Sequence, residues 1–221
     1  AAGHETALLQ LCEDLAPLPT RAEFQERVRA AAPDVVGFSV VTTQWAYACE
    51  LAAWARDVVD VPIVCGGIHA LAAPEQILGE TAFDYLFVGE CEDAVCEFVD
   101  RLAAGESVEH VRNLGFRRGE QVVLNPVRHL PDLRTLPAKD YGIFSFQQII
   151  DAKRGWVGLM ASRGCPFNCS YCFNHAMVKR YRADLDCGFR ELNYIRHFPV
   201  DRMIEEIRFL LATYDNISMF I

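Results

Sequence analysis

The chain has 221 residues, 52% of them hydrophobic and 23% charged, which is the composition of a packed protein with one large domain or two small ones. Its 21 basic and 30 acidic residues give a net charge of −9 without any basic block, so no nucleic-acid partner is expected. The longest apolar stretches, such as residues 35–41, are far shorter than the roughly 20 residues of a membrane span, so no membrane span is expected either.

In the first 105 residues, predicted helices and strands alternate. Apolar residues at helical spacing predict the helices, and the near-continuous β-branched run at 35–41 predicts a parallel strand that is covered on both faces. The predicted elements are helices at 5–15 and 21–32, a strand at 35–41, a helix at 44–58, a strand at 62–65, a helix from Pro74, a strand at 84–88 and a helix at 92–103. This order predicts an α/β domain with a doubly wound (Rossmann/flavodoxin-like) parallel sheet, whose ligand binds at the carboxyl ends of the strands.

The remaining residues are predicted to form a connection and a second unit. Residues 114–117 and 121–124 have the pattern of a β-hairpin, and the prolines that follow indicate a linker, so we assign 106–152 to hairpin and linker. A second unit is expected over residues 153–221. Its predicted elements are a strand at 156–161, a cysteine-rich loop, a helix at 200–214 and a strand at 217–221.

The two ends of the sequence lead to an expectation about its completeness. Residue 1 is Ala, and the opening residues lack the basic region and apolar core of a secretory signal. The predicted strand at 217–221 has nothing after it. We therefore expect a fragment of a longer protein, cut at both ends, with little or no turnover of its own.

Eight of the nine cysteines fall into two groups, and Cys187 stands apart from both. Five of them, at 12, 49, 65, 91 and 96, lie mostly within apolar helix or strand patterns and are expected to pack as small hydrophobic residues. Cys165, Cys169 and Cys172 instead crowd into eight residues. Without a signal peptide a disulfide scaffold is not expected, which leaves metal or redox chemistry in a reducing compartment, the cytoplasm.

Two kinds of metal site fit the spacing Cys165-x3-Cys169-x2-Cys172. Soft sulfur ligands favour zinc or an iron–sulfur cluster. A structural zinc site closes with four protein ligands, and His175 or Cys187 could supply the fourth. A four-iron cluster held by three cysteines instead leaves one iron open to a substrate or cofactor.

Residues 162–172, with the sequence SRGCPFNCSYC, resemble the cluster loop of radical S-adenosylmethionine (radical SAM) enzymes. The resemblance implies that Cys165, Cys169 and Cys172 hold a 4Fe-4S cluster whose open iron binds S-adenosylmethionine. Cleavage of that molecule would give a 5′-deoxyadenosyl radical. Tyr171 matches the aromatic position that lies near the adenine in this family. Residues 153–221 would then be the first strands and helix of a truncated radical SAM partial (β/α) barrel.

The first 105 residues resemble the cobalamin-binding domain that precedes the barrel in one large class of these enzymes, class B. The resemblance lies in residues 33–39, 62–69 and 83–92, which end predicted strands. Glycines there would let the backbone approach the macrocycle, and hydroxyl groups would donate hydrogen bonds to it. The residues expected to contact cobalamin are Ser39, Thr42, Thr43, Gly66, Gly67, His69, Gly89 and Glu90. For His69, a hydrogen bond within the loop is the alternative interpretation.

The combination of cofactors suggests a function. The resemblance implies a cobalamin-dependent radical SAM methyltransferase, in which the adenosyl radical activates an unreactive carbon and methylcobalamin delivers a methyl group to it. Its partners would be a small-molecule or natural-product substrate and an electron donor such as flavodoxin or ferredoxin. The alternatives are a cyclisation or rearrangement that uses the same cofactors, and a noncatalytic cobalamin- or zinc-binding module. Residues 173–198, rich in aromatic and basic side chains, would contact an anionic ligand or form a solvated interface.

Overall fold

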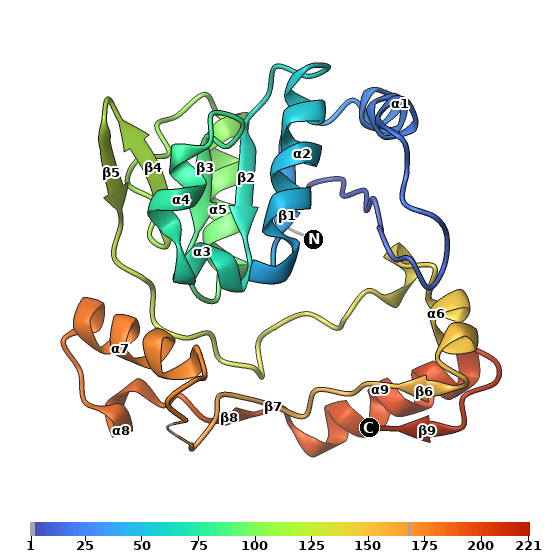
Figure 1. Ribbon diagram of the computed structural model, residues 1–221. Coiled ribbons are helices and arrows are strands. Elements are labelled where there is room, and N and C mark those ends of the chain that lie inside the picture. The colour runs from blue at the N-terminus through green and yellow to red at the C-terminus, as the bar shows by residue number, and fades with distance from the viewer. Residues whose placement is uncertain (1–2, 168) are drawn as a thin grey trace. The chain divides into compact units, whose positions relative to one another are not determined.

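The computed structural model describes residues 3–167 and 169–221 (Figure 1). The chain folds into two compact units. The first, here called the sheet unit, comprises Arg21–Leu130 and Phe167–Tyr194, and the second, the back unit, comprises Ala1–Thr20, Pro131–Pro166 and Ile195–Ile221. This division differs from the boundaries expected near residues 105 and 152, because the helix that follows the cysteine loop packs with the sheet.

The sheet unit is built on one five-stranded sheet with the order β1-β2-β3-β4-β5. Strands β1, β2 and β3 pair in parallel, so the predicted α/β fold with a parallel sheet is confirmed. Strands β4 and β5 form the predicted hairpin and add to β3 in antiparallel direction, so the hairpin extends the sheet rather than standing in a linker. The strands are β1 (Val36–Ser39), β2 (Ile63–Gly66), β3 (Tyr85–Phe87), β4 (Leu114–Arg118) and β5 (Gln121–Leu124).

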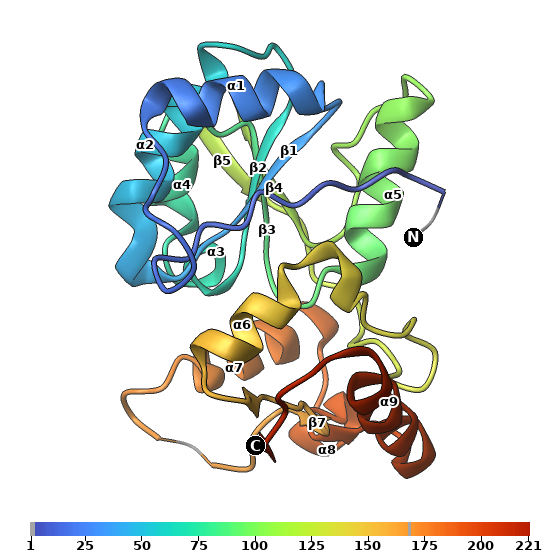
Figure 2. The ribbon, with the colours of Figure 1, turned by 90° about the vertical axis from the view of Figure 1, so that its right-hand side faces the viewer.

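Helices cover both faces of this sheet, with α5 on one face and α2 and α4 on the other (Figure 2). The ends of the predicted helices agree with the structure to within a few residues, and α3 is an additional short helix after β2. The helical elements are α1 (Arg21–Ala31), η1 (Thr42–Gln44), α2 (Trp45–Arg56), α3 (Ile68–Ala72), α4 (Pro74–Gly79), α5 (Glu92–Ala103), α7 (Asn174–Leu185) and α8 (Phe189–Leu192).

The core on one face of the sheet is aromatic. Phe98 of α5 is fully buried and meets the rings of Tyr85 and Phe87 edge to face, with ring centroids 5.2 and 5.4 Å apart. Edge-to-face pairs add favourable energy to the burial of their apolar surface. Because Tyr85 and Phe87 both belong to β3, this packing fixes α5 against the strand whose end carries Gly89 and Glu90.

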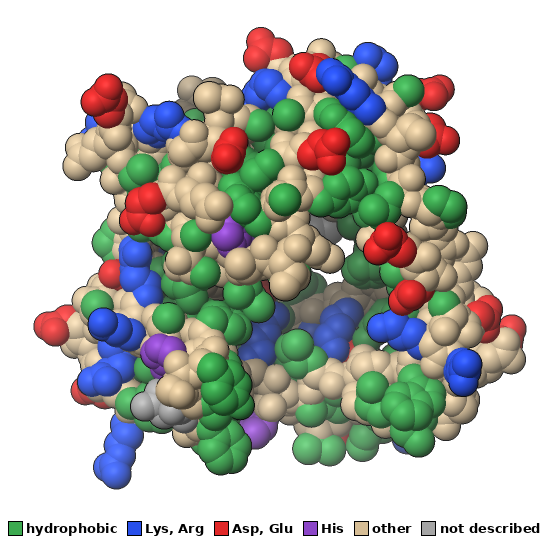
Figure 3. All heavy atoms as spheres, viewed as in Figure 1, with side chains coloured by type: hydrophobic (Ala, Val, Ile, Leu, Met, Phe, Trp, Pro, Cys, Tyr) green, Lys and Arg blue, Asp and Glu red, His purple; other side chains and the backbone are tan. Residues whose placement is uncertain are grey.

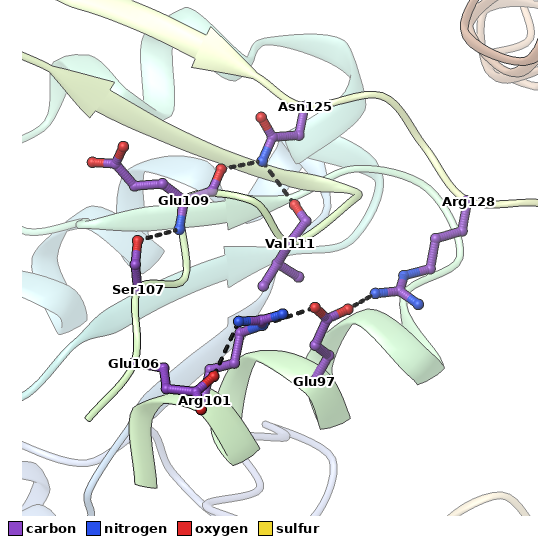
Figure 4. A network of polar contacts seen from close by, with 8 residues as sticks. All are labelled: Glu97, Arg101, Glu106, Ser107, Glu109, Val111, Asn125 and Arg128. Carbon is purple, nitrogen blue, oxygen red and sulfur yellow. Dashed lines mark hydrogen bonds and ion pairs between the residues drawn. The ribbon is translucent and has the colours of Figure 1, made fainter. Parts of the chain in front are cut away.

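A polar network fixes the connections around α5 (Figure 4). Glu97 accepts a 2.8 Å hydrogen bond from Arg101 and also pairs with Arg128, which follows the hairpin. The side-chain amide of Asn125 donates to the carbonyls of Glu109 and Val111, each at 2.8 Å. The two hydrogen bonds of Asn125 satisfy backbone carbonyls that lie outside the strand ladder.

Asn113 is a fully buried polar residue directly before β4. Its amide nitrogen donates to the carbonyl of Val88 at 2.7 Å, and its side-chain oxygen accepts from the backbone N–H of Arg128 at 2.9 Å. Its φ of +70° lies in the left-handed region, where Asn is tolerated better than most residues. Asn113 therefore connects the end of β3 to the segment that leaves the hairpin.

The back unit contains two small pairs of strands. Strand β6 (Trp156–Val157) pairs in parallel with β9 (Met219–Phe220), and β7 (Ser162–Arg163) pairs antiparallel with β8 (Arg196–His197). The expected strand at 156–161 is therefore shorter than predicted, because β6 and β7 are separate strands with different partners. The helical elements of this unit are η2 (Tyr141–Ile143), α6 (Phe146–Ala152) and α9 (Val200–Thr213).

The back unit has a small core and much exposed apolar surface. Tyr141, Ile150, Val157 and Leu210 form the core. Large apolar side chains on β6, α9 and β9 are exposed, and Figure 3 shows hydrophobic surface over these elements. The predicted helix at 5–15 is wrong, since residues 4–12 have no regular secondary structure. So short a helix needs tertiary packing of an apolar face, and Leu8 is largely exposed.

None of the helices among the described residues combines the length and apolar character that crossing a bilayer requires.

Replacing Asn113 with Ala should destabilise the sheet unit by about 2–4 kcal/mol, because it leaves buried backbone groups without partners. Asn193 is the matched control. It has a φ of +48° in the same unit but is exposed, so Asn193→Ala should cost only about 1 kcal/mol. Urea unfolding followed by circular dichroism measures both changes. Equal losses would show that the hydrogen bonds of Asn113 contribute nothing beyond its backbone conformation.

Candidate cofactor sites

The predicted cobalamin contacts lie at one edge of the sheet, here called the carboxyl edge: the carboxyl ends of β1, β2 and β3 with the loops that follow them. Ser39 at the end of β1 stands opposite Gly66 at the end of β2. Ser39, Thr42 and Thr43 are exposed, as is Gly67. Parallel strands thus bring hydroxyl groups and a glycine pair to one accessible edge, where α/β sheets bind their ligands.

Gly67 is required by the protein's own packing. Its φ is +88°, and a Cβ atom there would lie 2.6 Å from the carbonyl oxygen of Val40. Backbone N–H groups tie the two loops together, since Val40 donates to Gly66 at 3.0 Å and His69 donates to Val40 at 3.1 Å. The glycine at 67 therefore allows the loops after β1 and β2 to approach each other. Gly66 has ordinary space around the position of a Cβ atom.

His69 is buried, with 2% of its surface exposed. Its Nδ1 lies 3.2 Å from the hydroxyl of Thr42, and its ring packs on Trp45 with centroids 4.5 Å apart. Burial lowers the pKa of the imidazole below its ordinary value, which favours the neutral ring. Its Nε2 is buried and has no hydrogen-bond partner within the protein. The structure therefore brings Thr42 and His69 together, as the hydrogen-bonding interpretation of His69 expects.

Gly89 and Glu90 follow β3 and contact helix α7. The N–H of Glu90 donates to the hydroxyl of Tyr181 at 2.8 Å. Gly89 has a φ of +82°, and a Cβ atom there would lie 2.9 Å from carbons of the Tyr181 ring. These two predicted cofactor contacts are thus partly covered by a side chain from the helix that follows the cysteine loop.

The cysteine loop connects β7 to α7. Cys165, Cys169 and Cys172 are free thiols of intermediate exposure, and the N–H of Cys172 donates to the carbonyl of Cys169 at 3.1 Å. Tyr171 projects into solvent with 91% of its surface exposed. Within residues 3–167 and 169–221, no three His, Cys, Asp or Glu side chains gather closely enough to hold a metal. The soft thiol donor set suits an iron–sulfur cluster. Cys165 belongs to the back unit, whereas Cys169 and Cys172 belong to the sheet unit.

Three cysteines outside the cysteine loop, Cys49, Cys65 and Cys91, differ from metal ligands in their pKa values. Burial is the largest cause that raises the pKa of Cys65 and of Cys91 to about 12, and that of Cys49 to about 11. Such thiols stay protonated at neutral pH, whereas a metal ligand must be a thiolate. These pKa values agree with the packing role expected from the sequence.

Sequence reasoning missed the role of residues 173–198. Tyr181, Tyr194 and Arg196 are buried, so the expectation of a solvated interface is wrong for these three. Met177, Tyr181 and Leu185 recur at a spacing of four, which is the signal of a helix with an apolar stripe. That pattern could have identified α7 and its buried tyrosine.

A comparison with protein families matches residues 1–99 to the B12 binding domain. Two curated relatives cover most of the chain. An uncharacterized methyltransferase of Pyrococcus horikoshii is 28% identical over 96% of this chain and 46% of its own length. The anaerobic magnesium-protoporphyrin IX monomethyl ester cyclase of Synechocystis is 29% identical over 82% of this chain and 37% of its own length. The chain thus spans less than half the length of either relative.

Solved structures share the fold. The radical S-adenosylmethionine methyltransferase TsrM from Kitasatospora setae, with tryptophan and a SAM analog bound, matches with a TM-score of 0.64 at 17% identity, over 88% of this chain and 39% of TsrM. The cobalamin-dependent S-adenosylmethionine radical enzyme OxsB, with aqua-cobalamin bound, matches with a TM-score of 0.68 at 18% identity, over 87% of this chain and 25% of OxsB. Residues 1–99 thus match the B12 binding domain, and the chain shares its fold with TsrM and OxsB over most of its length.

Proposed function

We propose that this chain is the cofactor-binding part of a cobalamin-dependent radical SAM methyltransferase that acts on an unactivated carbon. The main support for this proposal is the order of two features in the chain. Residues 1–99 match the B12 binding domain, and a loop with Cys165, Cys169 and Cys172 follows them and leads into a helix. The methyltransferase among the curated relatives supports the choice of reaction.

The carboxyl edge offers groups that suit cobalamin, whose periphery carries amide side chains. Ser39, Thr42 and Thr43 are exposed and can donate or accept hydrogen bonds there. Gly66 lets the backbone approach a planar group, and His69 positions the Thr42 hydroxyl through the contact between Nδ1 and Oγ1.

The cysteine loop would hold the second cofactor. Thiolates of Cys165, Cys169 and Cys172 would bind three irons of a 4Fe-4S cluster, and the exposed ring of Tyr171 is free to pack on the adenine of S-adenosylmethionine. When bound, these cofactors supply a carbon-centred radical, and cobalamin supplies a methyl group. Reduction of the cluster requires an electron donor, such as flavodoxin or ferredoxin, and the substrate is a small molecule or natural product. An oxygen-sensitive cluster of this kind would suit the reducing cytoplasm, which we propose as the location of the protein.

Anaerobic reconstitution tests the cluster. The chain should take up about four iron atoms, and Cys169→Ala should abolish that uptake, because three thiolates are needed to hold the cluster. Cys187→Ala is the matched control and should keep the iron. Binding of hydroxocobalamin should survive Cys169→Ala. Loss of the metal site in Cys187→Ala, or uptake of a single zinc ion, would contradict the open cluster and favour a closed zinc site.

The hydroxyl of Thr42 should contribute to cobalamin affinity. Thr42→Val keeps the shape of the side chain and removes the hydroxyl, so the Kd for hydroxocobalamin should rise about three- to tenfold. Thr135→Val removes a hydroxyl that bonds within the linker and should leave the Kd unchanged. Titration followed by the visible spectrum of the corrinoid measures both. An equal Kd in the two variants would remove Thr42 from the binding site.

Cyclisation is the second candidate reaction, because three of the curated relatives are anaerobic magnesium-protoporphyrin IX monomethyl ester cyclases. Methyl-labelled S-adenosylmethionine separates the two reactions in the complete enzyme. A methyltransferase transfers the label to its product, and we expect labelled product. A product that forms without label would replace the methyltransferase proposal with the cyclisation.

A further inference from the structure

Helix α7 belongs to the sheet unit although it follows the cysteine loop in sequence. It begins at Asn174, directly after Cys172 and Phe173, and it packs against the short helix α3 that carries His69. Its central residue, Tyr181, is fully buried. One helix therefore connects the cysteine loop to the edge of the sheet where cobalamin is proposed to bind.

The loop over residues 88–90, at the end of β3, is fixed from two sides. Asn113 donates to the carbonyl of Val88 at 2.7 Å, while the N–H of Glu90 donates to the hydroxyl of Tyr181 at 2.8 Å. Between them, Gly89 has no space for a side chain because the Tyr181 ring fills the position of a Cβ atom. The conformation of this loop thus depends on Tyr181.

A second set of contacts fixes the same helix to the end of the hairpin. Asp184 accepts the N–H of Val127 at 2.9 Å, and Arg180 donates to the carbonyl of Asn125 at 3.1 Å. Arg180 and Asp184 also pair with each other at 2.6 Å, both of them being partly buried. With two anchors close to its carboxyl end, α7 holds a defined position on the sheet unit.

We propose that α7 forms one side of the cobalamin site and that Tyr181 is the positioning residue which couples this site to the cysteine loop. This inference rests on the proposed cobalamin binding. It gives Gly89 and Glu90 a different role from the one expected from the sequence, because they contact Tyr181. The contacts with cobalamin would then come from the loops after β1 and β2. Because coupling is reciprocal, cobalamin binding should order α7, and a well-ordered α7 should favour cobalamin binding.

Hydrogen–deuterium exchange and hydroxocobalamin titration test this coupling in the same samples. In the unsubstituted chain, hydroxocobalamin should slow exchange in the peptide covering residues 174–185. Tyr181→Phe keeps the ring but leaves the Glu90 N–H without its partner. In this variant the Kd should rise about three- to tenfold, and the cofactor-induced protection of residues 174–185 should be lost.

Tyr141→Phe is the matched control, because Tyr141 is a buried tyrosine of the back unit whose hydroxyl donates to Glu206. It should leave both readouts unchanged. If Tyr181→Phe lowers the melting temperature while Kd and protection remain as in the unsubstituted chain, Tyr181 is only structural and the inference is overturned. Failure of the unsubstituted chain to bind hydroxocobalamin would overturn the proposed cobalamin function as well.

A double-mutant cycle tests the contact itself. Gly89→Ala places a methyl group where the Tyr181 ring lies, so it should weaken hydroxocobalamin binding. In a Tyr181→Ala background there is no ring to displace, and the backbone strain at residue 89 is the same in both backgrounds. The effect of Gly89→Ala on the Kd should therefore largely disappear in the double variant. Additive effects would show that residues 89 and 181 act independently, against the proposal.

Discussion

The buried side-chain amide of Asn113 provides hydrogen-bond partners for backbone groups at the end of β3 and after the hairpin. The sheet changes there from parallel to antiparallel pairing, and the carbonyl of Val88 lies just beyond the last pair of the ladder between β3 and β4. Asn113 supplies a donor to that carbonyl and accepts from the backbone of Arg128. Buried backbone groups are costly when unpaired, so the end of β3 and the exit of the hairpin must stay together. The contacts that anchor α7 lie on the same segment, because Asn125 and Val127 come shortly before Arg128.

The carboxyl edge is organised by a second constraint, the approach of two loops at Gly67. A side chain there would collide with the backbone of Val40. Because the loops after β1 and β2 lie close together, His69 contacts Thr42, and packing against the ring of Trp45 keeps the imidazole in place. A glycine that looks like a cofactor contact in the sequence is thus first an internal packing residue. Its effect on a ligand is indirect, because it determines where the hydroxyl groups stand.

Most of the sheet unit could be predicted from the sequence, because its signals are local. A β-branched run predicted β1, short apolar runs predicted β2 and β3, and the apolar stripe of residues 92–103 predicted α5 with the ends that it has in the structure. Three features of the structure could not be predicted in this way, because they depend on contacts between distant parts of the chain. The pairing of the hairpin with β3 depends on Asn113, and the burial of Tyr181 depends on a glycine 92 positions earlier in the chain. The failed helix at 5–15 has apolar spacing, but residues 4–12 have no regular secondary structure and Leu8 remains exposed.

In the candidate site, too, local sequence motifs were informative and contacts between distant parts of the chain were not foreseen. Short motifs pointed to Ser39, Thr42, Gly66 and His69, and the structure places Ser39 opposite Gly66 and Thr42 beside His69. No motif indicated that the side chain contacting Gly89 and Glu90 would come from beyond the cysteine loop. Domain boundaries drawn at composition changes separate the two cofactor motifs, whereas packing joins the helix after one motif to the sheet of the other. Under the proposed function this arrangement would help to align two cofactors, because a displacement of α7 at the cysteine loop would also move Tyr181 against Gly89 and Glu90.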